Sequence, residues 1–291
     1  MAEIKASNKL GTFRRYDTAL NKFKAFTGSN LSINKVDYNL LKRYELHLLN
    51  SLKNTRDTTS SNLSIIRTII NEGIRSNIYT KHNPFDQIHL KYSDNTKEKL
   101  TADELIRLKN VKLPPIPSLI LARDFFMACF LAEGTRAGDM IAMQKGNIIN
   151  GYLVFRQMKT GKQMTIMITD DLAEIINCYS TSGIFIFPLL NNVKDVNEIV
   201  INSKLTLMNK YLKEVAKYAG IFKKLTTHVG RHTFTDLALK ATDGNIYLVQ
   251  QSLGHSSVKT TELYSRNRVN LNSGSIMTDI LSLINVERRE E

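Results

Sequence analysis

The chain has 291 residues, of which 40 are Lys or Arg and 27 are Asp or Glu, so its formal net charge is +13. A hydrophobic fraction of 42% and a charged fraction of 23% are typical of a globular protein and exclude a disordered or collagen-like chain. The longest apolar stretch, residues 116–132, is interrupted by Arg123 and Asp124 and is too polar to span a bilayer. The positive charge indicates a polyanionic partner, and nucleic acid is the commonest one.

Cysteine usage and the N-terminus indicate a reduced compartment. Cys129 and Cys178 form neither a C-x-x-C metal motif nor a disulfide framework. Residues 1–15 are polar and lack the apolar core of a secretory signal. We therefore expect a cytoplasmic protein.

Charge and sequence pattern divide the chain into two parts. Residues 1–99 carry 17 basic and 9 acidic side chains, whereas residues 100–291 carry 23 and 18. The segment 91–99 is polar and aperiodic, as linkers are, and Thr101 with Glu104 then forms a capping box that begins a helix. The prediction is a helical domain over 1–92, a linker over 93–99, and a second domain over 100–291 whose tail is 267–291.

The first domain is predicted to be a helical bundle, because its apolar residues recur at helical spacing. A cluster of hydroxyl and amide side chains at 58–62 is predicted to begin the third helix. The three apolar stripes are Phe13, Tyr16, Leu20 and Phe23; Leu41, Tyr44 and Leu48; and Leu63, Ile66, Ile70 and Ile74.

The second domain combines helices with a small sheet. Asn150-Gly151 separates two apolar runs and predicts a two-residue hairpin. A second turn, 159–162, precedes the apolar run 164–168, so we expect a three-stranded antiparallel sheet inserted in a helical body. The predicted fold class is thus mainly α with a small antiparallel β-sheet.

Several common chemistries lack their motifs. The sequence contains no G-x-S-x-G elbow, no phosphate-binding P-loop and no G-x-G-x-x-G. His228 and His232 are four residues apart and could share a metal on a helix, but position 229 is Val229 and no nearby carboxylate completes a ligand set. We expect no metal and no other cofactor.

Six basic, imidazole and phenol side chains follow one another in an ordered set: Arg136, Lys159, His228, Arg231, His255 and Tyr264. Each of them alone has an ordinary explanation, such as a surface ion pair or a core tyrosine. Gly254 is predicted to end one helix, and Ser256 or Ser257 to begin a short one that carries Tyr264.

The ordered set resembles the tyrosine recombinase (phage integrase) family. Four segments carry the resemblance: Arg136-Ala-Gly-Asp139-Met140, Met158-Lys159-Thr160-Gly161-Lys162, His228-Val-Gly-Arg231-His232-Thr233, and Leu253-Gly254-His255 with Thr261-Glu-Leu-Tyr264. Asp139 stands where the family more often has Glu, and we expect it to support the arginine. The first domain is similar to the family's SAM-like core-binding domain. An additional arm-binding domain, which some members of the family carry, would not fit ahead of Phe13, so we expect either that the protein lacks it or that the sequence is a fragment.

The resemblance implies a site-specific DNA recombinase that cuts and rejoins strands through a 3′-phosphotyrosyl link, for integration or excision of a mobile element. Tyr264 is then the nucleophile, and His228 accepts its proton. Arg136 and Arg231 bind the transition-state phosphate, because guanidiniums stay charged and bind oxygens bidentately. Lys159 protonates the departing 5′ oxygen. His255 donates a hydrogen bond to the phosphate.

The resemblance also implies partners. We expect duplex DNA, a homotetramer on synapsed sites, a monomer free in solution, and accessory DNA-bending or directionality factors. In the first domain, the predicted DNA-backbone contacts are Arg14, Arg15, Ser60 and Arg67.

Two other functions remain open at the level of sequence. A type IB topoisomerase-like enzyme uses nearly the same residues, and a non-catalytic DNA-binding regulator would explain the loose helix-turn-helix pattern over 244–265. The tail is a third open point. Ile276, Ile280, Leu283 and Ile284 form one helical stripe that fits either its own domain or, as in the family, a neighbouring protomer.

Overall fold

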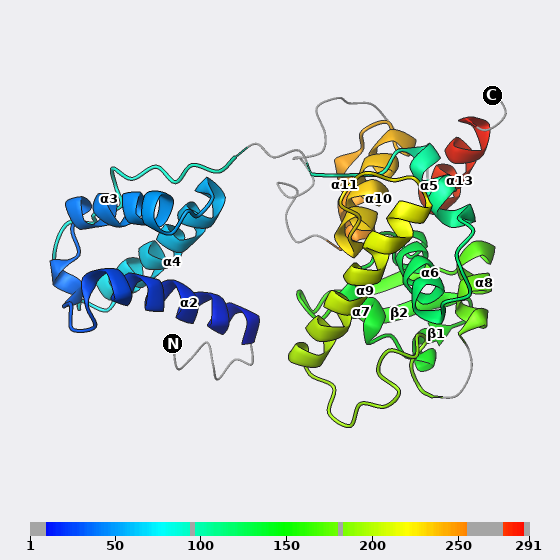
Figure 1. Cartoon of the computed structure of the whole chain (residues 1–291), viewed down its shortest axis with the longest axis horizontal. Helices are drawn as coiled ribbons and strands as arrows, with labels where there is room; N and C mark the ends of the chain where they lie inside the picture. The colour runs from blue at the N-terminus through cyan, green and yellow to red at the C-terminus, as the bar shows by residue number, and fades with distance from the viewer. Residues whose placement is uncertain (1–9, 94–96, 180–182, 255–275, 288–291) are drawn as a thin grey trace. The chain divides into compact units, whose positions relative to one another are not determined.

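The computed structural model describes residues 10–93, 97–179, 183–254 and 276–287, with the backbone alone for 282–287. The chain folds into two compact units, residues 1–96 and 97–291 (Figure 1). Both are mainly helical, and the second holds a three-stranded sheet. Within the described ranges, no helix has the length and apolar character needed to cross a membrane.

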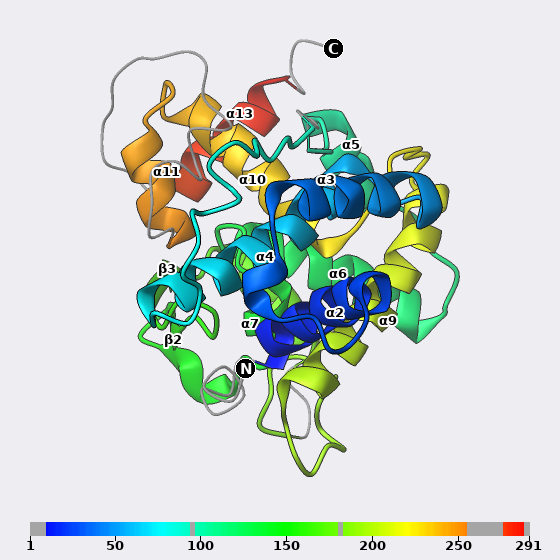
Figure 2. The same cartoon turned by 90° about the vertical axis from the view of Figure 1, so that its left-hand side faces the viewer.

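The first unit is a helical bundle with the buried Tyr44 in its core. Its described elements are α2 (Leu10–Thr27), a 3₁₀ turn (Ile33–Lys35), α3 (Tyr38–Leu46), a π-helical turn (His47–Ser51) and α4 (Arg56–Arg75). Helix α4 packs against both α2 and α3 (Figure 2). The buried Tyr44 ring meets the Phe23 ring edge-on, with centroids 4.9 Å apart. The predicted stripes supply most of this core, namely Phe23, Leu41, Tyr44, Leu48, Leu63, Ile66 and Ile70, and residues outside the stripes complete it: Val36, Tyr79, Phe85 and Ile88.

The predicted start of the third helix is wrong by less than one turn. Helix α4 begins at Arg56, and the Thr55 hydroxyl caps it by accepting from the Thr58 N–H at 3.2 Å. The segment 58–62 lies inside the helix, where the Asn62 amide donates back to the Thr58 carbonyl at 2.7 Å. Hydroxyl and amide side chains suit both caps and such back-bonds, so burial decided between them.

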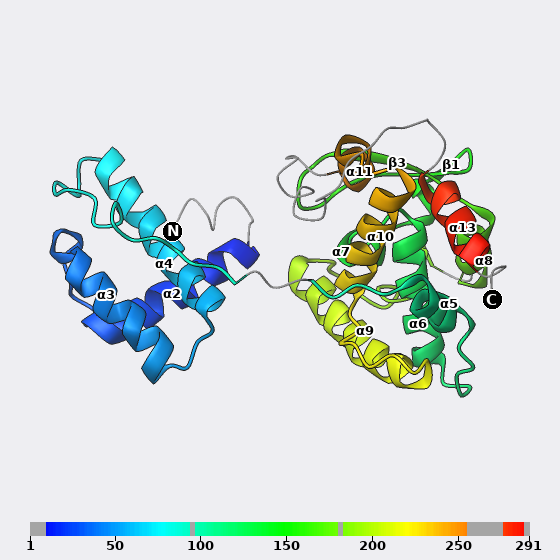
Figure 3. The same ribbon diagram turned by 90° about the horizontal axis from the view of Figure 1, so that it is seen from above.

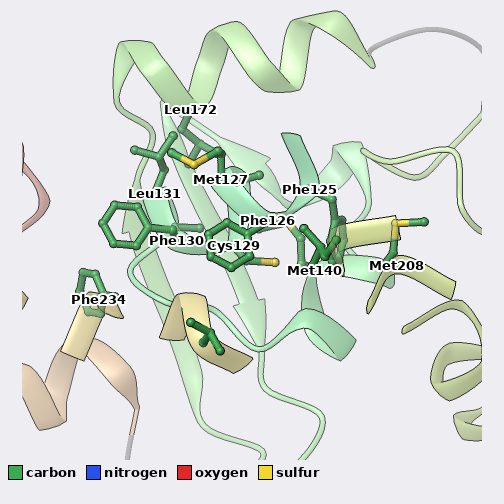
Figure 4. Close-up of a cluster of buried hydrophobic side chains, with 14 of the residues drawn as sticks. Phe125, Phe126, Met127, Cys129, Phe130, Leu131, Met140, Leu172, Met208 and Phe234 are labelled. Carbon is green, nitrogen blue, oxygen red and sulfur yellow. The ribbon is translucent and has the colours of Figure 1, made fainter. Parts of the chain in front are cut away.

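The second unit is built around α6 (Pro117–Leu131), which is apolar on all sides. Figure 4 shows its side chains packed among those of other helices. Phe125, Phe126 and Phe130 of α6 meet Leu172 of α8 (Asp170–Cys178), Met208 of α9 (Glu198–Tyr218) and Phe234 of α10 (Thr227–Ala241). Arg123 and Asp124, the charged interruption of the apolar stretch, pair with each other at 2.8 Å. The stretch is thus the central helix of the core.

The predicted hairpin and sheet are confirmed. Strands β1 (Ile148–Ile149), β2 (Tyr152–Arg156) and β3 (Gln163–Met167) are antiparallel in the order β1-β2-β3. Asn150 and Gly151 both have left-handed backbone, with φ of 49° and 81°, as a type I′ turn requires.

The entry to the second unit is tied to α10. The predicted capping box is present, with Thr101 and Glu104 satisfying each other's backbone N–H at the start of α5 (Ala102–Asn110). Just before it, the Leu100 N–H donates to the Thr233 hydroxyl at 2.9 Å, and Lys99 pairs with Asp236. The first residues of the unit therefore brace the helix that carries His228 and Arg231.

Helix α13 (Ile276–Glu287) packs on its own unit. It lies along α10 (Figure 3), and Ile276, Met277 and Ile280 are buried there. The helical stripe predicted from the sequence is present up to the last described side chain. Of the two partners left open for this stripe, the structure shows its own unit for Ile276 and Ile280. Docking of the tail on a neighbouring protomer stays a prediction.

Candidate active site

Arg136 lies at the start of α7 (Ala137–Ile141), directly after a tight turn. Glu133 and Gly134 have left-handed backbone, with φ of 52° and 64°, and so end α6 and reverse the chain. A Cβ on Gly134 would lie 3.1 Å from the Phe234 ring, so glycine lets this turn pack on α10. The half-buried Arg136 guanidinium donates from Nη1 to Gln157 Oε1 at 2.7 Å. Burial lowers its pKa, but a guanidinium remains charged.

Arg231 is buried and connects three elements. Helix α10 begins at Thr227, whose N–H donates to Asn209 Oδ1 of α9 at 2.9 Å. One turn later, Arg231 Nη1 donates to the Gly134 carbonyl at 2.7 Å, and Nη2 donates to the Leu253 carbonyl at 2.8 Å. The guanidinium thus fixes the turn before Arg136 and the end of α11 (Ile246–Leu253) relative to each other.

Gln157, which the sequence analysis did not single out, links the same places. Its Oε1 accepts from Arg136 and from the Thr160 hydroxyl, each at 2.7 Å, and its Nε2 donates to the Leu253 carbonyl at 3.2 Å. A signal was present in the sequence. Leu153 and Phe155 lie on the inward face of β2, and Gln157 continues that alternation one residue after the strand. A glutamine at such an inward position needs hydrogen-bond partners.

Asp139 faces both arginines but bonds to the hairpin. Its Oδ1 accepts from the Met158 N–H at 2.8 Å, which ties α7 to the residue before Lys159. Burial raises the pKa of the Asp139 carboxyl, and the Met158 N–H and the charges of Arg136 and Arg231 oppose that rise. The carboxylate therefore supports the arginines through its charge and holds the hairpin through its hydrogen bond.

Two imidazoles lie on the same face of α10. The rings of His228 and His232 have centroids 4.8 Å apart. Partial burial lowers the pKa of His232 to about 4, and it also lowers the pKa of His228, which keeps one side open to solvent. The cations that lower the His228 pKa further are Arg231, Lys97, Arg136 and Lys159. Among the described residues, no three His, Cys, Asp or Glu side chains gather as metal ligands would.

Lys159 is exposed on the hairpin turn. The turn is closed by the Gly161 N–H, which donates to the Gln157 carbonyl at 2.8 Å, and Gly161 has a φ of 68°. Helix α11 ends as predicted at Gly254, whose φ of 64° is left-handed. Four of the six predicted site residues thus come together, and His255 and Tyr264 lie outside the described residues.

The four predicted DNA contacts of the first unit divide into two pairs. Arg14 and Arg15 are exposed on α2. Ser60 is buried and its hydroxyl donates to the Lys91 carbonyl at 2.5 Å. Arg67 donates from Nη2 to the carbonyl of residue 88 at 2.6 Å. The second pair therefore holds the segment 88–91 against α4, through the Ser60 hydroxyl and Arg67 Nη2.

Two family models match the chain. The phage integrase family matches residues 98–270, and the phage integrase SAM-like domain matches residues 1–93. The chain belongs to the phage integrase family. As a member it is a site-specific DNA recombinase of the tyrosine type, an enzyme that transfers DNA strands.

Individual members of the phage integrase family agree with this result. Tyrosine recombinase XerD of Staphylococcus aureus is 27% identical over 272 residues, which cover 89% of this chain and 88% of that protein. Among solved structures, a lambda integrase dimer bound to a COC′ core site matches with a TM-score of 0.69 and 19% identity, covering 94% of this chain and 96% of that one. The Tn1549 transposon integrase with transposon right end DNA matches with a TM-score of 0.67 and 15% identity, covering 100% and 98%. The predicted fold class is confirmed.

Proposed function

We propose that the second unit cleaves and rejoins DNA with the ordered set Arg136, Lys159, His228, Arg231, His255 and Tyr264. One observation carries the proposal: Arg231 directly, and Arg136 through Gln157, converge on the Leu253 carbonyl. Two cations are thereby held near the end of α11, two residues before His255. Two guanidiniums held close together suit the binding of a phosphate, because its negative charge grows in the transition state. In this proposal, His255 donates a hydrogen bond to that phosphate.

In the proposed step, the Tyr264 phenol oxygen attacks the scissile phosphorus and its proton passes to the His228 imidazole. Arg136 and Arg231 stabilise the additional charge on the non-bridging oxygens. The bond between phosphorus and the 5′ oxygen breaks, and Lys159 gives that oxygen a proton. The products are a 3′-phosphotyrosyl link and a free 5′ hydroxyl, and attack by a 5′ hydroxyl reverses the step. Because the 3′-phosphotyrosyl link conserves the energy of the broken phosphodiester bond, neither ATP nor a metal ion is needed.

The electrostatics of His228 support its part in this step. Burial and the surrounding cations lower its pKa, so the ring is neutral at pH 7 and has a lone pair for the phenol proton. A phenol, with a pKa of about 10 in water, needs such an acceptor nearby.

We also propose that duplex DNA is the partner of both units and that four chains assemble on two synapsed sites. The excess of basic residues and the exposed Arg14 and Arg15 of α2 support contact with the DNA backbone. Lambda integrase, a neighbour in fold, has been solved as a tetramer bound to a Holliday junction.

The test uses duplexes selected for binding from a random-sequence pool and resynthesised with a nick beside each candidate cleavage position. The nick releases a short strand after cleavage, so the covalent complex accumulates. Wild type is expected to form an adduct that survives denaturing electrophoresis, whereas Tyr264→Phe binds equally well and forms none. No adduct with wild type would favour a DNA-binding regulator. An adduct that persists in Tyr264→Phe would refute this nucleophile, and relaxation of supercoiled DNA without synapsis would favour the topoisomerase-like function.

A further inference from the structure

Gln157 is a buried polar residue whose partners all belong to the site. The residue follows directly after β2 and is 3% exposed. The amide contacts Arg136, the Thr160 hydroxyl and the Leu253 carbonyl. These three partners lie on α7, on the hairpin turn beside Lys159, and at the end of α11.

The chemistry of the partners determines how the amide is oriented. A guanidinium only donates hydrogen bonds and a main-chain carbonyl only accepts them. Oε1 must therefore face Arg136, and Nε2 must face Leu253. A glutamate at this position could accept from Arg136 but would present a second oxygen to the Leu253 carbonyl, so it could not make both bonds.

Gly254 provides the space that this amide occupies. A Cβ at Gly254 would lie 2.6 Å from Gln157 Nε2 and 2.7 Å from Met164 Sδ, which is closer than carbon atoms approach other heavy atoms. The left-handed end of α11 and the amide thus fit together, and each limits the movement of the other.

We propose that Gln157 is a positioning residue for strand cleavage: it aims the Arg136 guanidinium at the scissile phosphate and couples it to the end of α11. The proposal rests on the function proposed for Arg136. A long arginine side chain has rotamer freedom to lose, and a fixed acceptor removes that freedom before the phosphate arrives.

A neutral acceptor has a further advantage over a carboxylate. A carboxylate bonded to Arg136 would compete with the phosphate for its positive charge, whereas an amide oxygen orients the group and leaves the charge available. The carboxylate on α7, that of Asp139, accepts a hydrogen bond from the Met158 N–H instead. Gln157→Glu is therefore expected to impair cleavage even though it retains an acceptor for Arg136.

The experiment measures single-turnover cleavage by the full-length protein on three versions of one selected, nicked site. The first is the ordinary phosphodiester. The second has sulfur in place of the bridging 5′ oxygen, which leaves without a proton and so bypasses Lys159. The third is a methylphosphonate, in which a neutral methyl group replaces a negatively charged non-bridging oxygen, so that the positive charge of Arg136 is no longer needed to stabilise it. Urea unfolding and half-site affinity are measured alongside, so that a folding defect is recognised.

Gln157→Met and Gln157→Glu are expected to slow cleavage of the phosphodiester by about 10- to 100-fold, the scale of one misplaced catalytic group. The loss should be equally large on the sulfur substrate and below about threefold on the methylphosphonate. Arg136→Ala should give the same pattern. Gln163→Met, the same change at an exposed position of β3, is the matched control and should match wild type on all three substrates.

Equal losses on all three substrates, or rescue by sulfur, would overturn the proposal, because Gln157 would then act through general stability or through Lys159. If Gln157→Met is too unstable to measure, Gln157→Glu decides by the same comparison. Wild type serves as the test of the underlying function. If wild type forms no Tyr264-dependent adduct, the proposed function fails, whereas normal cleavage by both Gln157 variants refutes this inference alone.

Discussion

Ile280→Ala tests whether α13 stabilises the unit on which it packs. Ile280 is fully buried against α10, and Met277 beside it is 1% exposed. The substitution removes three carbon atoms, which at about 0.8 kcal/mol each is about 2.4 kcal/mol of lost burial. The cavity left behind raises the expected loss of unfolding free energy to about 3–4 kcal/mol. Thr278→Ala is the control, because Thr278 lies two residues earlier and is exposed; it should change the unfolding free energy by less than about 0.5 kcal/mol.

The assay is urea unfolding of the full chain with pulsed hydrogen exchange, read on peptides of α10. With a slope of about 2 kcal/mol per molar urea, the midpoint for these peptides should fall by about 1.5–2 M. The fall should be the same at protein concentrations tenfold apart, because the contact lies within one chain.

Two results would refute this reasoning. A loss below about 0.5 kcal/mol would mean that α10 does not depend on α13. A loss that appears only at the higher protein concentration would mean that α13 packs on another chain, as in a protomer-linking tail.

Three further predictions concern the site and the DNA contacts. Because burial and nearby cations lower its pKa, His228 should stay a neutral acceptor to a lower pH than a free imidazole does, so the midpoint of the acidic fall in the cleavage rate should lie below the free value of about 6.5; a midpoint above the free value would contradict this. Gly254→Ala forces a Cβ against Gln157 in a left-handed conformation, so thermal unfolding should show a loss of at least about 1–2 kcal/mol, and an unchanged Tm would contradict the fit. Arg14→Ala with Arg15→Ala should flatten the salt dependence of DNA affinity by about two units, and an unchanged slope would return both residues to a solvated surface.

Local chemistry explains the parts of the fold that were predicted correctly. The Thr101 capping box, the Asn150-Gly151 turn and the Gly254 helix end each depend on residues within a few positions of one another. The start of α4 was predicted less well, because Thr55 and the segment 58–62 offer similar capping groups. The segment 58–62 is largely buried inside the bundle as part of the helix, which leaves Thr55 as the N-cap, and no local sequence pattern reports such burial.

The site, too, has features that local sequence predicted and features that depend on the tertiary fold. The order of Arg136, Lys159, His228 and Arg231 carried a resemblance to the tyrosine recombinase family, and that resemblance implied their roles. The sequence did not reveal that Gln157 joins Arg136 to the end of α11.

The sequence by itself thus determined the helices, the hairpin and the types of residue in the site, since these follow from periodicity, turn chemistry and charge over short distances. Tertiary structure decided what those side chains contact. Ile280 packs on α10, and Ser60 and Arg67 turn toward partners inside the first unit. Leu253 accepts from two residues that are 22 and 96 positions away along the chain. Such contacts depend on which buried polar and apolar groups meet when the helices pack, and that is settled by the fold as a whole.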